Sequence, residues 1–416
     1  MTSECFVYIT LPRQTAPVTA GRFELSQDRN GVSVGRFVYG RSYRQRDDAL
    51  PIDPAELKLA PGAYQTTQLK GVFGALRDAG PDYWGRLVIE RYHKKPSLDE
   101  MTYLLNAPDD CAGALGFGLN QKPPAPTRKF NRTRDLAKLQ AIADAVINDT
   151  PLEEEDRYAE QLLLVGTAMG GARPKCVVED TDGLWLAKFN RDDDTWNAAR
   201  VEHSMLVLAR ACGLTTAESR ITQIGGKDVL LVKRFDREKT EQGYLRARMI
   251  SGLTLLRTDE TARENWSYVS MAEELRRVCA APKQAAPELF RRMVFNALIS
   301  NTDDHPRNHA IIAKDRDWKL SPAYDLTPTN PVGIEHRDLA MICGDAGRFA
   351  NAKNLLSQCA RFLLERAQAQ KIVDDMAELV TSRWYEIARG EGVSEADCKR
   401  IAGAFVYPGF RAAPAE

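Results

Sequence analysis

Residues 301–308 read NTDDHPRN and residues 320–325 read LSPAYD, and these two stretches carry the clearest chemical signal in the chain. Asp303 could accept a proton from a hydroxyl group, and Asn308, five residues later, could bind a metal ion. Asp325 could bind the same ion from the opposite side. Phosphoryl transfer requires mainly that the attacking oxygen is oriented and that the phosphate charge is neutralised. The two stretches therefore predict a site for Mg²⁺ and a nucleoside triphosphate.

The segments around these stretches are expected to bring them together. PELFRRMVFNALIS (287–300) has apolar pairs on one helical face, and the polar octet follows its end. HAIIAKD and WKLSPAYD then read as two strands, so a hairpin would carry Asp325 back beside Asp303 and Asn308. The Asp-x₄-Asn spacing matches the catalytic loop of protein kinases, in which the Asp accepts the hydroxyl proton and the Asn holds Mg²⁺. The alternative is an Asx-rich surface loop that caps its neighbours.

Residues 336–340 read HRDLA, the beginning of the usual protein-kinase motif HRDLxxxN, but this match is a chance one. The fifth residue after Asp338 is Cys343, and a thiol is a poor ligand for Mg²⁺. The stretch also follows Asp325, whereas the motif has to precede the metal-binding Asp. We exclude it from the site.

A Gly-rich loop precedes a predicted hairpin made of CVVED, a Thr-Asp-Gly turn and LWLAKF (184–189). Gly170 and Gly171 in this loop would let the backbone approach phosphate oxygens and could form an anion-binding nest. Lys188 is expected to bind the α- and β-phosphates, as the β3 lysine of kinases does, and Lys175 is the second candidate. The alternative for Lys188 is an edge-strand lysine in solvent.

Two further segments complete the predicted nucleotide site. Glu202, on a helix expected at about 197–212, could pair with Lys188 as the αC glutamate of kinases does, or could be an ordinary helix-face carboxylate. VLLVKRFDR (229–237) predicts a strand that leads into the connection between two lobes. Backbone groups around Arg234 and Phe235 could bond an adenine edge, with an apolar contact from Phe235, and Asp236 could reach the ribose or a basic neighbour. The alternative is a buried strand that ends in a salt-bridged turn.

The chain is 44% apolar and 27% charged, which is typical of a soluble globular protein. Its length of 416 residues predicts two or three domains. The 57 basic and 57 acidic residues give a net charge of zero, so the global charge neither predicts nor excludes nucleic-acid binding. The eight cysteines are scattered without a CxxC pair, which favours reduced thiols and argues against a zinc site. The N-terminus does not resemble a signal peptide, and no stretch approaches an apolar span of about 20 residues. We therefore expect a cytoplasmic protein without membrane contact.

The N-terminal part of the chain mostly shows the alternation typical of strands, and the C-terminal part mostly shows helical periodicity. Residues 5–10 and 32–39 alternate around a turn at 28–31, and the helical pattern begins at about 260 and is strongest at 350–386. The Pro-rich and basic stretch 121–133 reads as a linker, and a helix-start signature follows at Thr150, Pro151 and Glu153. These features predict an α+β, two-lobed protein-kinase-like fold with an extra N-terminal subdomain. The predicted units are a β-rich N-terminal subdomain (1–120), a linker (121–149), a small lobe with the Gly-rich loop (150–236) and a helical large lobe with the catalytic loop and metal site (237–416).

Six segments in order along the chain resemble the HipA family, the kinase toxins of bacterial toxin–antitoxin pairs. They are PDYWGRLVIER (81–91), GGARPK (170–175), WLAKF (185–189), VKRFDR (232–237), NTDDHPRNHAII (301–312) and LSPAYDLTP (320–328). The resemblance implies that Asp303 is the catalytic base, that Asn308 and Asp325 bind Mg²⁺, and that Lys188 binds ATP. It also implies that His305 belongs to the same catalytic loop.

The resemblance further implies a biological role. The implied activity is Ser/Thr phosphorylation of a translation enzyme, typically an aminoacyl-tRNA synthetase, which leads to growth arrest and persistence. A small helix-turn-helix antitoxin (HipB-like) that also represses the operon is the implied partner, so contact with DNA would be indirect. A lipid or small-molecule kinase with the same fold, and a non-catalytic antitoxin-binding co-regulator of transcription, are the alternatives.

The chain departs from the family pattern at three places. Several family members carry an autophosphorylated Ser two residues before the GG pair, where this chain has Ala168, although Thr167 beside it could substitute. Lys233 occupies a position that is often Glu, which could alter the adenine contacts. Asp304 is a second acid where the family frequently has a small residue, and a like charge beside Asp303 should raise the proton affinity of the pair.

Overall fold

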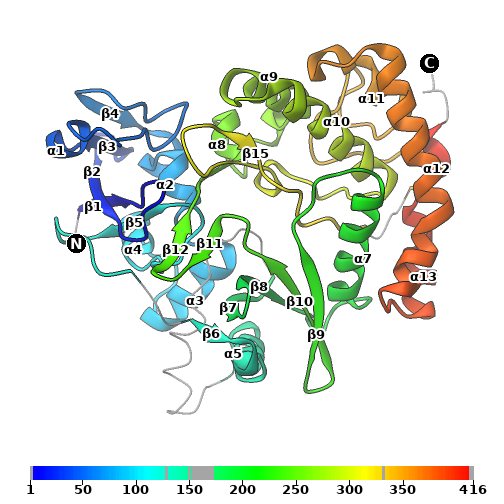
Figure 1. Ribbon diagram of the computed structural model, residues 1–416, viewed down its shortest axis with the longest axis horizontal. Coiled ribbons are helices and arrows are strands. Elements are labelled where there is room, and N and C mark those ends of the chain that lie inside the picture. Colours follow the sequence, from blue (N-terminus) through cyan, green and yellow to red (C-terminus); the bar gives the residue numbers. More distant parts are fainter. Residues whose placement is uncertain (1–2, 127–129, 149, 151–172, 330–332, 412–416) are drawn as a thin grey trace.

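An antiparallel sheet of five strands forms the N-terminal part of the chain, in the order β4-β3-β2-β1-β5 (Figure 1). The computed structural model describes residues 3–126, 130–148, 150, 173–329 and 333–411. The Asp28 carboxylate accepts hydrogen bonds from the amides of Asn30 and Val32, each at 2.8 Å, and Gly31 has a φ of 77°, which favours glycine. The predicted turn at 28–31 is therefore confirmed. The strands are β1 Glu4–Ile9, β2 Val18–Gln27, β3 Ser33–Tyr39, β4 Ala63–Thr66 and β5 Leu115–Gly118.

Short helices accompany this sheet, and one of them was visible in the sequence. The helical pattern after residue 81 predicts α3, which begins where the Asp82 carboxylate accepts a 2.7 Å hydrogen bond from the Gly85 amide. The helix α2 has five residues, too few for a periodic apolar pattern to reveal it. The helices are α1 Arg41–Arg44, α2 Gly74–Asp78, α3 Tyr83–His93 and α4 Glu100–Leu105.

The small lobe is built on a second five-stranded sheet, in the order β6-β7-β8-β10-β9. The hairpin predicted from CVVED and LWLAKF is confirmed, since β7 and β8 pair antiparallel and Asp180 faces Gly183 across the turn. The helix α7 Ala198–Ala211 packs against β9 and β10. The strands are β6 Asn131–Arg132, β7 Lys175–Asp180, β8 Gly183–Phe189, β9 Ser219–Ile224 and β10 Lys227–Lys233.

The structure differs from the sequence-based prediction between residues 121 and 149. This range contains β6, which pairs in parallel with β7, and the helix α5 Leu136–Ile147. Leu139 and Ile142 of α5 are buried in the core of the small lobe, because the apolar residues of α5 recur on one helical face. The later part of the predicted linker therefore packs as part of the small lobe. The helix-start signature at Pro151 and Glu153 lies outside the described residues.

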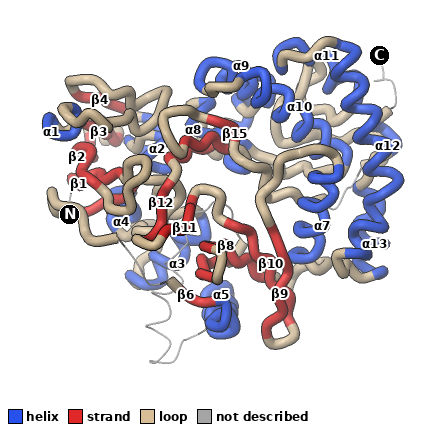
Figure 2. Tube along the Cα trace, viewed as in Figure 1, coloured by secondary structure: helices blue, strands red, loops and turns tan. Residues whose placement is uncertain are grey.

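The large lobe combines two small sheets with the helices that gather on the right of Figure 2. The predicted hairpin before Asp325 is confirmed, since Ile311 of β14 pairs with Leu320 of β15. The strands are β11 Arg237–Thr240, β12 Gly243–Arg246, β13 Arg248–Ser251, β14 Ala310–Ala313 and β15 Lys319–Leu320. The helices are α8 Gly252–Leu256, α9 Tyr268–Val278, α10 Pro282–Leu298, α11 Ala352–Ser357, α12 Arg366–Gly390 and α13 Glu395–Ile401.

The N-terminal part contacts both lobes. Helix α2 packs against β13 and α8 of the large lobe, whereas α3 packs against α5 of the small lobe. Trp84 and Val88 of α3 belong to the same buried cluster as the small-lobe sheet. The chain thus has an α+β, two-lobed architecture with an N-terminal subdomain that touches each lobe separately. Within the described ranges, no helix is both long and apolar enough to cross a membrane.

Candidate active site

Lys188 on β8 is the central cation of the candidate site. Its ammonium donates hydrogen bonds to Glu202 Oε1 on α7 at 2.6 Å and to Asp325 Oδ1 at 2.8 Å. Burial lowers the pKa of Lys188, but the carboxylates of Asp325 and Glu202 outweigh burial and raise the pKa above its ordinary value. Lys188 is therefore charged at neutral pH, and the pair with Glu202 expected from the sequence is present.

Asp325 is held in position by its own backbone and by the residue before it. Its φ of 59° lies in the left-handed region, which Asp tolerates better than most residues. The hydroxyl of Tyr324 donates a 2.9 Å hydrogen bond to the carbonyl of Arg307, which ties this segment to the loop 301–308. Burial raises the pKa of Asp325, but Lys188 outweighs burial and lowers it to about 2. Asp325 is therefore ionised.

The loop 301–308 is anchored by Asp304, whose side chain is buried. Asp304 Oδ2 accepts hydrogen bonds from Asn296 Nδ2 at 2.8 Å, from His309 Nε2 at 2.7 Å and from the hydroxyl of Tyr268. Asn296 lies on α10 and Tyr268 on α9, so one carboxylate fixes the loop to two helices. Asp303, by contrast, is exposed. The two adjacent acids have different roles, because one is enclosed and the other faces outward.

The environment of Asp303 increases the proton affinity of its carboxylate. Its pKa is raised, first by partial burial and then by the charges of Asp325 and Asp304, against the opposing effect of His305. The contribution from Asp304 agrees with the direction that the sequence predicted, although burial is the larger cause. Asp303 and Asp325 are thus close enough for their charges to interact. Nδ1 of His305 is buried and has no hydrogen-bond partner among the described residues.

A cavity beside Lys188 is the candidate nucleotide site. Phe235 and Tyr324 face each other there with ring centroids 5.7 Å apart, which supplies an apolar surface suited to a base. Lys188, Asn308 and Asp325 line the same cavity, so groups suited to a base and groups suited to phosphates lie together. The rest of its polar lining is Lys233, Arg234 and Arg307. Its apolar lining is Leu186, Val232, Phe235, Met249 and Tyr324.

The donor set suits Mg²⁺. Two carboxylates and an amide (Asp303, Asp325 and Asn308) offer the oxygen ligands that this ion prefers, and Asp325 is ionised. In the part of the chain that the structure describes, no three His, Cys, Asp or Glu side chains are clustered to hold a metal ion. The predicted set does not need such a cluster, since one of its members is an amide and nucleotide phosphates supply ligands in sites of this kind. The convergence of these three side chains on one ion stays a prediction.

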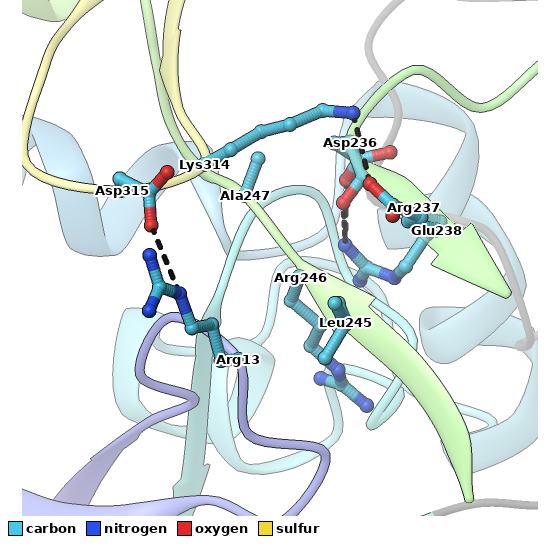
Figure 3. Close-up of a pocket in the computed structure, with 9 residues that line it drawn as sticks. All are labelled: Arg13, Asp236, Arg237, Glu238, Leu245, Arg246, Ala247, Lys314 and Asp315. Atoms are coloured by element: carbon cyan, nitrogen blue, oxygen red, sulfur yellow. Dashed lines mark hydrogen bonds and ion pairs between the residues drawn. The ribbon is translucent and has the colours of Figure 1, made fainter. Parts of the chain in front are cut away.

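The side chains of Arg234 and Asp236, two residues predicted to contact the nucleotide, are buried in ion pairs, although Arg234 also lines the nucleotide cavity. The Arg234 guanidinium contacts Asp236 at 2.8 Å and Asp110 at 2.7 Å, and Arg237 contacts Asp236 at 2.7 Å. Figure 3 shows Asp236 and Arg237 facing each other in a separate pocket, where Lys314 reaches Glu238 and Arg13 reaches Asp315. Of the two partners expected for Asp236, a ribose or a basic neighbour, the structure shows the basic one.

The backbone near Phe235 still borders the cleft. The Arg234 amide donates a 2.9 Å hydrogen bond to the carbonyl of Leu184, so this amide is already engaged by the small-lobe sheet. Arg234 is therefore not a free donor for an adenine through its own amide, and its side chain is fully buried. Phe235 lines the cavity as the sequence predicts.

Lys175, the second candidate for phosphate binding, has a structural partner instead. Its ammonium lies 2.9 Å from Asp82 Oδ2, and its carbonyl accepts a 3.0 Å hydrogen bond from Trp84 Nε1. Only 1% of Lys175 is exposed, so its charge faces α3 rather than open solvent. Gly170 and Gly171, with the neighbouring Thr167 and Ala168, lie outside the described residues.

Sequence reasoning missed the support that the N-terminal part gives to the site. The Asp78 carboxylate on α2 accepts hydrogen bonds from the Ser251 amide, the Ser251 hydroxyl and the Thr254 hydroxyl, each at 2.7 Å. It also lies 3.9 Å from Arg307 in the loop 301–308, and Arg307 pairs with Glu260 as well. The signal that could have found this contact is Asp78 itself, three residues before the start of the PDYWGR segment at Pro81.

Comparison with known proteins shows which family has this two-domain organisation. The HipA-like C-terminal domain matches residues 167–384, more than half of the chain, and the HipA N-terminal domain matches residues 17–118. This chain belongs to the HipA family. The family assignment identifies it as an enzyme of the serine/threonine kinase class, and it confirms the resemblance seen in the six sequence segments.

Individual relatives are distant. The chain is 25% identical over 321 residues, 74% of each chain, to Y4mE of Sinorhizobium fredii, a protein named as a candidate kinase. It is 26% identical over 155 residues to the serine/threonine-protein kinase toxin HipA of Shewanella oneidensis, covering 33% of this chain and 36% of that one. A solved structure of Shewanella oneidensis HipA, in complex with HipB and operator DNA, matches with a TM-score of 0.68 at 17% identity, over 96% of this chain and 94% of that one. The last match establishes the shared fold.

Proposed function

We propose that this chain is a Mg-ATP-dependent serine/threonine protein kinase of the HipA toxin type. In this proposal it phosphorylates a component of translation, such as an aminoacyl-tRNA synthetase, and so arrests growth. The observation that carries the proposal is the Lys188 ammonium held between Glu202 and Asp325, at 2.6 Å and 2.8 Å. This pairing joins the two lobes at the point where phosphates would be neutralised.

Each residue of the site has a distinct task in the proposed reaction. Lys188, oriented by Glu202, would hold the α- and β-phosphates, and Asn308 and Asp325 would hold Mg²⁺. Bound ATP and Mg²⁺ supply the phosphoryl group and neutralise its charge. Asp303 would accept the proton of the acceptor hydroxyl, and its raised pKa makes it a better base than an ordinary surface carboxylate.

The proposed partner is a small helix-turn-helix antitoxin. Support comes from the Shewanella oneidensis HipA structure, which was solved with HipB and operator DNA. The balanced charge of the present chain, 57 basic and 57 acidic residues, neither predicts nor excludes contact with DNA, and in this proposal that contact is made through the antitoxin.

Phosphate transfer tests the proposal. The full chain is incubated with labelled ATP, Mg²⁺ and a bacterial lysate, and the labelled proteins are identified by mass spectrometry. Asp303→Ala is expected to lose at least 100-fold of the labelling, while the matched variant Asp317→Ala, at another exposed Asp, keeps it. Equal labelling by the wild type and Asp303→Ala would contradict the proposal. Mg-ATP should also raise the melting temperature, because a ligand of the folded state stabilises it.

A further inference from the structure

A second and larger cavity, of about 670 Å³, lies beside the loop 301–308. One wall comes from the N-terminal subdomain, including Lys70 and Tyr83, and the other comes from residues 253–266 of the large lobe. His305 belongs to its lining. Its volume is in the range of well-formed binding sites, and it does not belong to the nucleotide cavity.

The loop 301–308 contributes to the lining of both cavities. Arg307 lines both of them, Asn308 lines the nucleotide cavity, and His305, two residues from Asp303, lines the second cavity. A hydroxyl group that enters through the second cavity would therefore reach the loop that carries Asp303. Phosphoryl transfer needs the attacking hydroxyl to meet the nucleotide phosphate beside such a base.

Arg263 is an uncompensated charge in this second cavity. Its guanidinium lies over the ring of Trp266, 5.6 Å from the centroid, and forms no ion pair with any side chain in the described ranges. Trp266 in turn packs edge-on against His305 with ring centroids 6.2 Å apart. Arg263 is thus linked, through Trp266 and His305, to the loop that carries the proposed base.

The other charges around this cavity are largely balanced. Glu260 is neutralised by Arg307 and by Arg77, at 3.7 Å from the latter. Asp259 accepts hydrogen bonds from the amides of Thr261 and Ala262 at 2.7 Å and 2.9 Å, which stabilise its charge. Lys70 lies 3.9 Å from Glu100, a carboxylate that Arg86 and Arg77 also contact. An anionic group that entered would therefore meet Arg263 and Lys70. Of these two cations, Arg263 is the one linked to the loop 301–308, because its ring partner Trp266 packs against His305.

We infer that the second cavity binds an extended segment of the acceptor protein and that Arg263 selects an acidic side chain close to the phosphorylated Ser or Thr. This inference rests on the proposed kinase activity and specifies its substrate class. Tyr83, which is 70% exposed at the rim, gives such a segment an aromatic contact outside the cavity. Arg263 is here a specificity residue and takes no part in the transfer itself.

Phosphosite mapping tests the inference. The full chain with Mg-ATP phosphorylates a bacterial lysate, and the sites are located by mass spectrometry for the wild type and for Arg263→Glu. Wild-type sites are expected to show an excess of Asp or Glu near the acceptor, and Arg263→Glu is expected to lose that excess or shift it toward Lys and Arg. Arg276→Ala, an exposed arginine on the neighbouring helix α9, serves as the matched control and should keep the wild-type pattern.

Kinetics with a synthetic peptide of the strongest site separate this role from a structural one. Arg263→Ala should raise the KM for the peptide about fivefold, the effect of one partly exposed ion pair, and leave kcat and the KM for ATP unchanged. A peptide whose acidic residue is replaced by Gln should show the raised KM with the wild type and no further rise with Arg263→Ala. If the wild type is active but its phosphosites show no excess of acidic residues, the inference is wrong and the proposed function stands. The same holds if Arg263→Glu keeps the wild-type excess. A wild type that labels nothing would overturn the proposed function together with it.

Discussion

The ammonium of Lys175 lies 2.9 Å from the carboxylate of Asp82, so a buried ion pair joins β7 of the small lobe to the N-cap residue of α3. Both side chains are at most 3% exposed. Removing one member of a buried ion pair strands the charge of the other, whereas removing both with apolar replacements does not.

A substitution of either member of this pair alone should therefore lower the stability of the fold. We expect Asp82→Leu to lower the free energy of unfolding by about 3–5 kcal/mol, and Lys175→Met to lower it by a similar amount. The double variant Asp82→Leu/Lys175→Met should be more stable than either single variant. Urea unfolding monitored by fluorescence measures all three. Additive losses in the double variant would show that the two charges do not stabilise each other.

Asp303 and Asp304 should respond in opposite ways to substitution. Asp304→Ala leaves the buried donors of Asn296 and His309 without an acceptor, so it should cost about 3 kcal/mol of stability. Asp303→Ala, at an exposed position, should change stability by no more than about 0.5 kcal/mol and abolish transfer. Thermal unfolding with a transfer assay on the same samples checks both. Comparable stability losses would contradict the separate tasks of the two acids.

The buried acid behind the cleft should make the fold sensitive to low pH. Burial by itself raises the pKa of Asp236, but Arg234 and Arg237 outweigh it and hold the pKa well below its usual value. The stabilisation is therefore present above the unfolded-state pKa of about 4 and is lost as the pH falls toward the folded-state pKa.

Urea midpoints measured from pH 6 to pH 2.5 test this linkage. The wild type should lose stability steadily below about pH 4, and Asp236→Asn should be less stable at pH 6 and show a flatter profile in acid. Asp317→Asn, at an exposed acid, should follow the wild-type profile. If the urea midpoint of Asp236→Asn fell as steeply in acid as that of the wild type, protonation of Asp236 would not be the cause of the acid sensitivity.

Gly252 at the start of α8 should tolerate no side chain. A Cβ at this position would lie 2.5 Å from the carbonyl oxygen of Pro306 in the catalytic loop. We expect Gly252→Ala to displace this loop and to lower kcat more than it raises the KM for ATP, because loop geometry sets the approach to Asp303. Gly390→Ala, where a Cβ meets nothing within 4 Å, should stay fully active. Unchanged kcat in Gly252→Ala would show that the loop adjusts without loss of alignment.

The regular elements could be predicted from local sequence wherever one element carried its own signal. The β7–β8 hairpin followed from the predicted turn at Thr181–Gly183, and the β14–β15 hairpin before Asp325 followed from two short apolar runs. The proximity of Lys188, Glu202 and Asp325 followed from the resemblance of their segments to kinase motifs. These features depend on neighbours in the chain or on a motif of known geometry.

The remaining features depend on partners that are distant in sequence. Arg234 and Asp236 are buried because Asp110, more than 120 residues earlier, completes their ion-pair network, and no local pattern announces that contact. Lys175 is enclosed for the same reason, since its partner Asp82 comes from a different sheet-and-helix unit. Helix α5 was hidden by the Pro-rich stretch before it, which dominated the composition of the predicted linker.

The short connection between α2 and α3 limits how the two lobes can move. Helix α2 is fastened to the large lobe through Asp78, and α3 is fastened to the small lobe through Asp82 and Trp84. Only Ala79, Gly80 and Pro81 lie between these two acids. While these contacts hold, a rotation of one lobe against the other turns this tripeptide as well as the direct connection near residues 233–237, and proline fixes one of its torsion angles. A stiffer tripeptide is therefore expected to restrict the relative rotation of the two lobes.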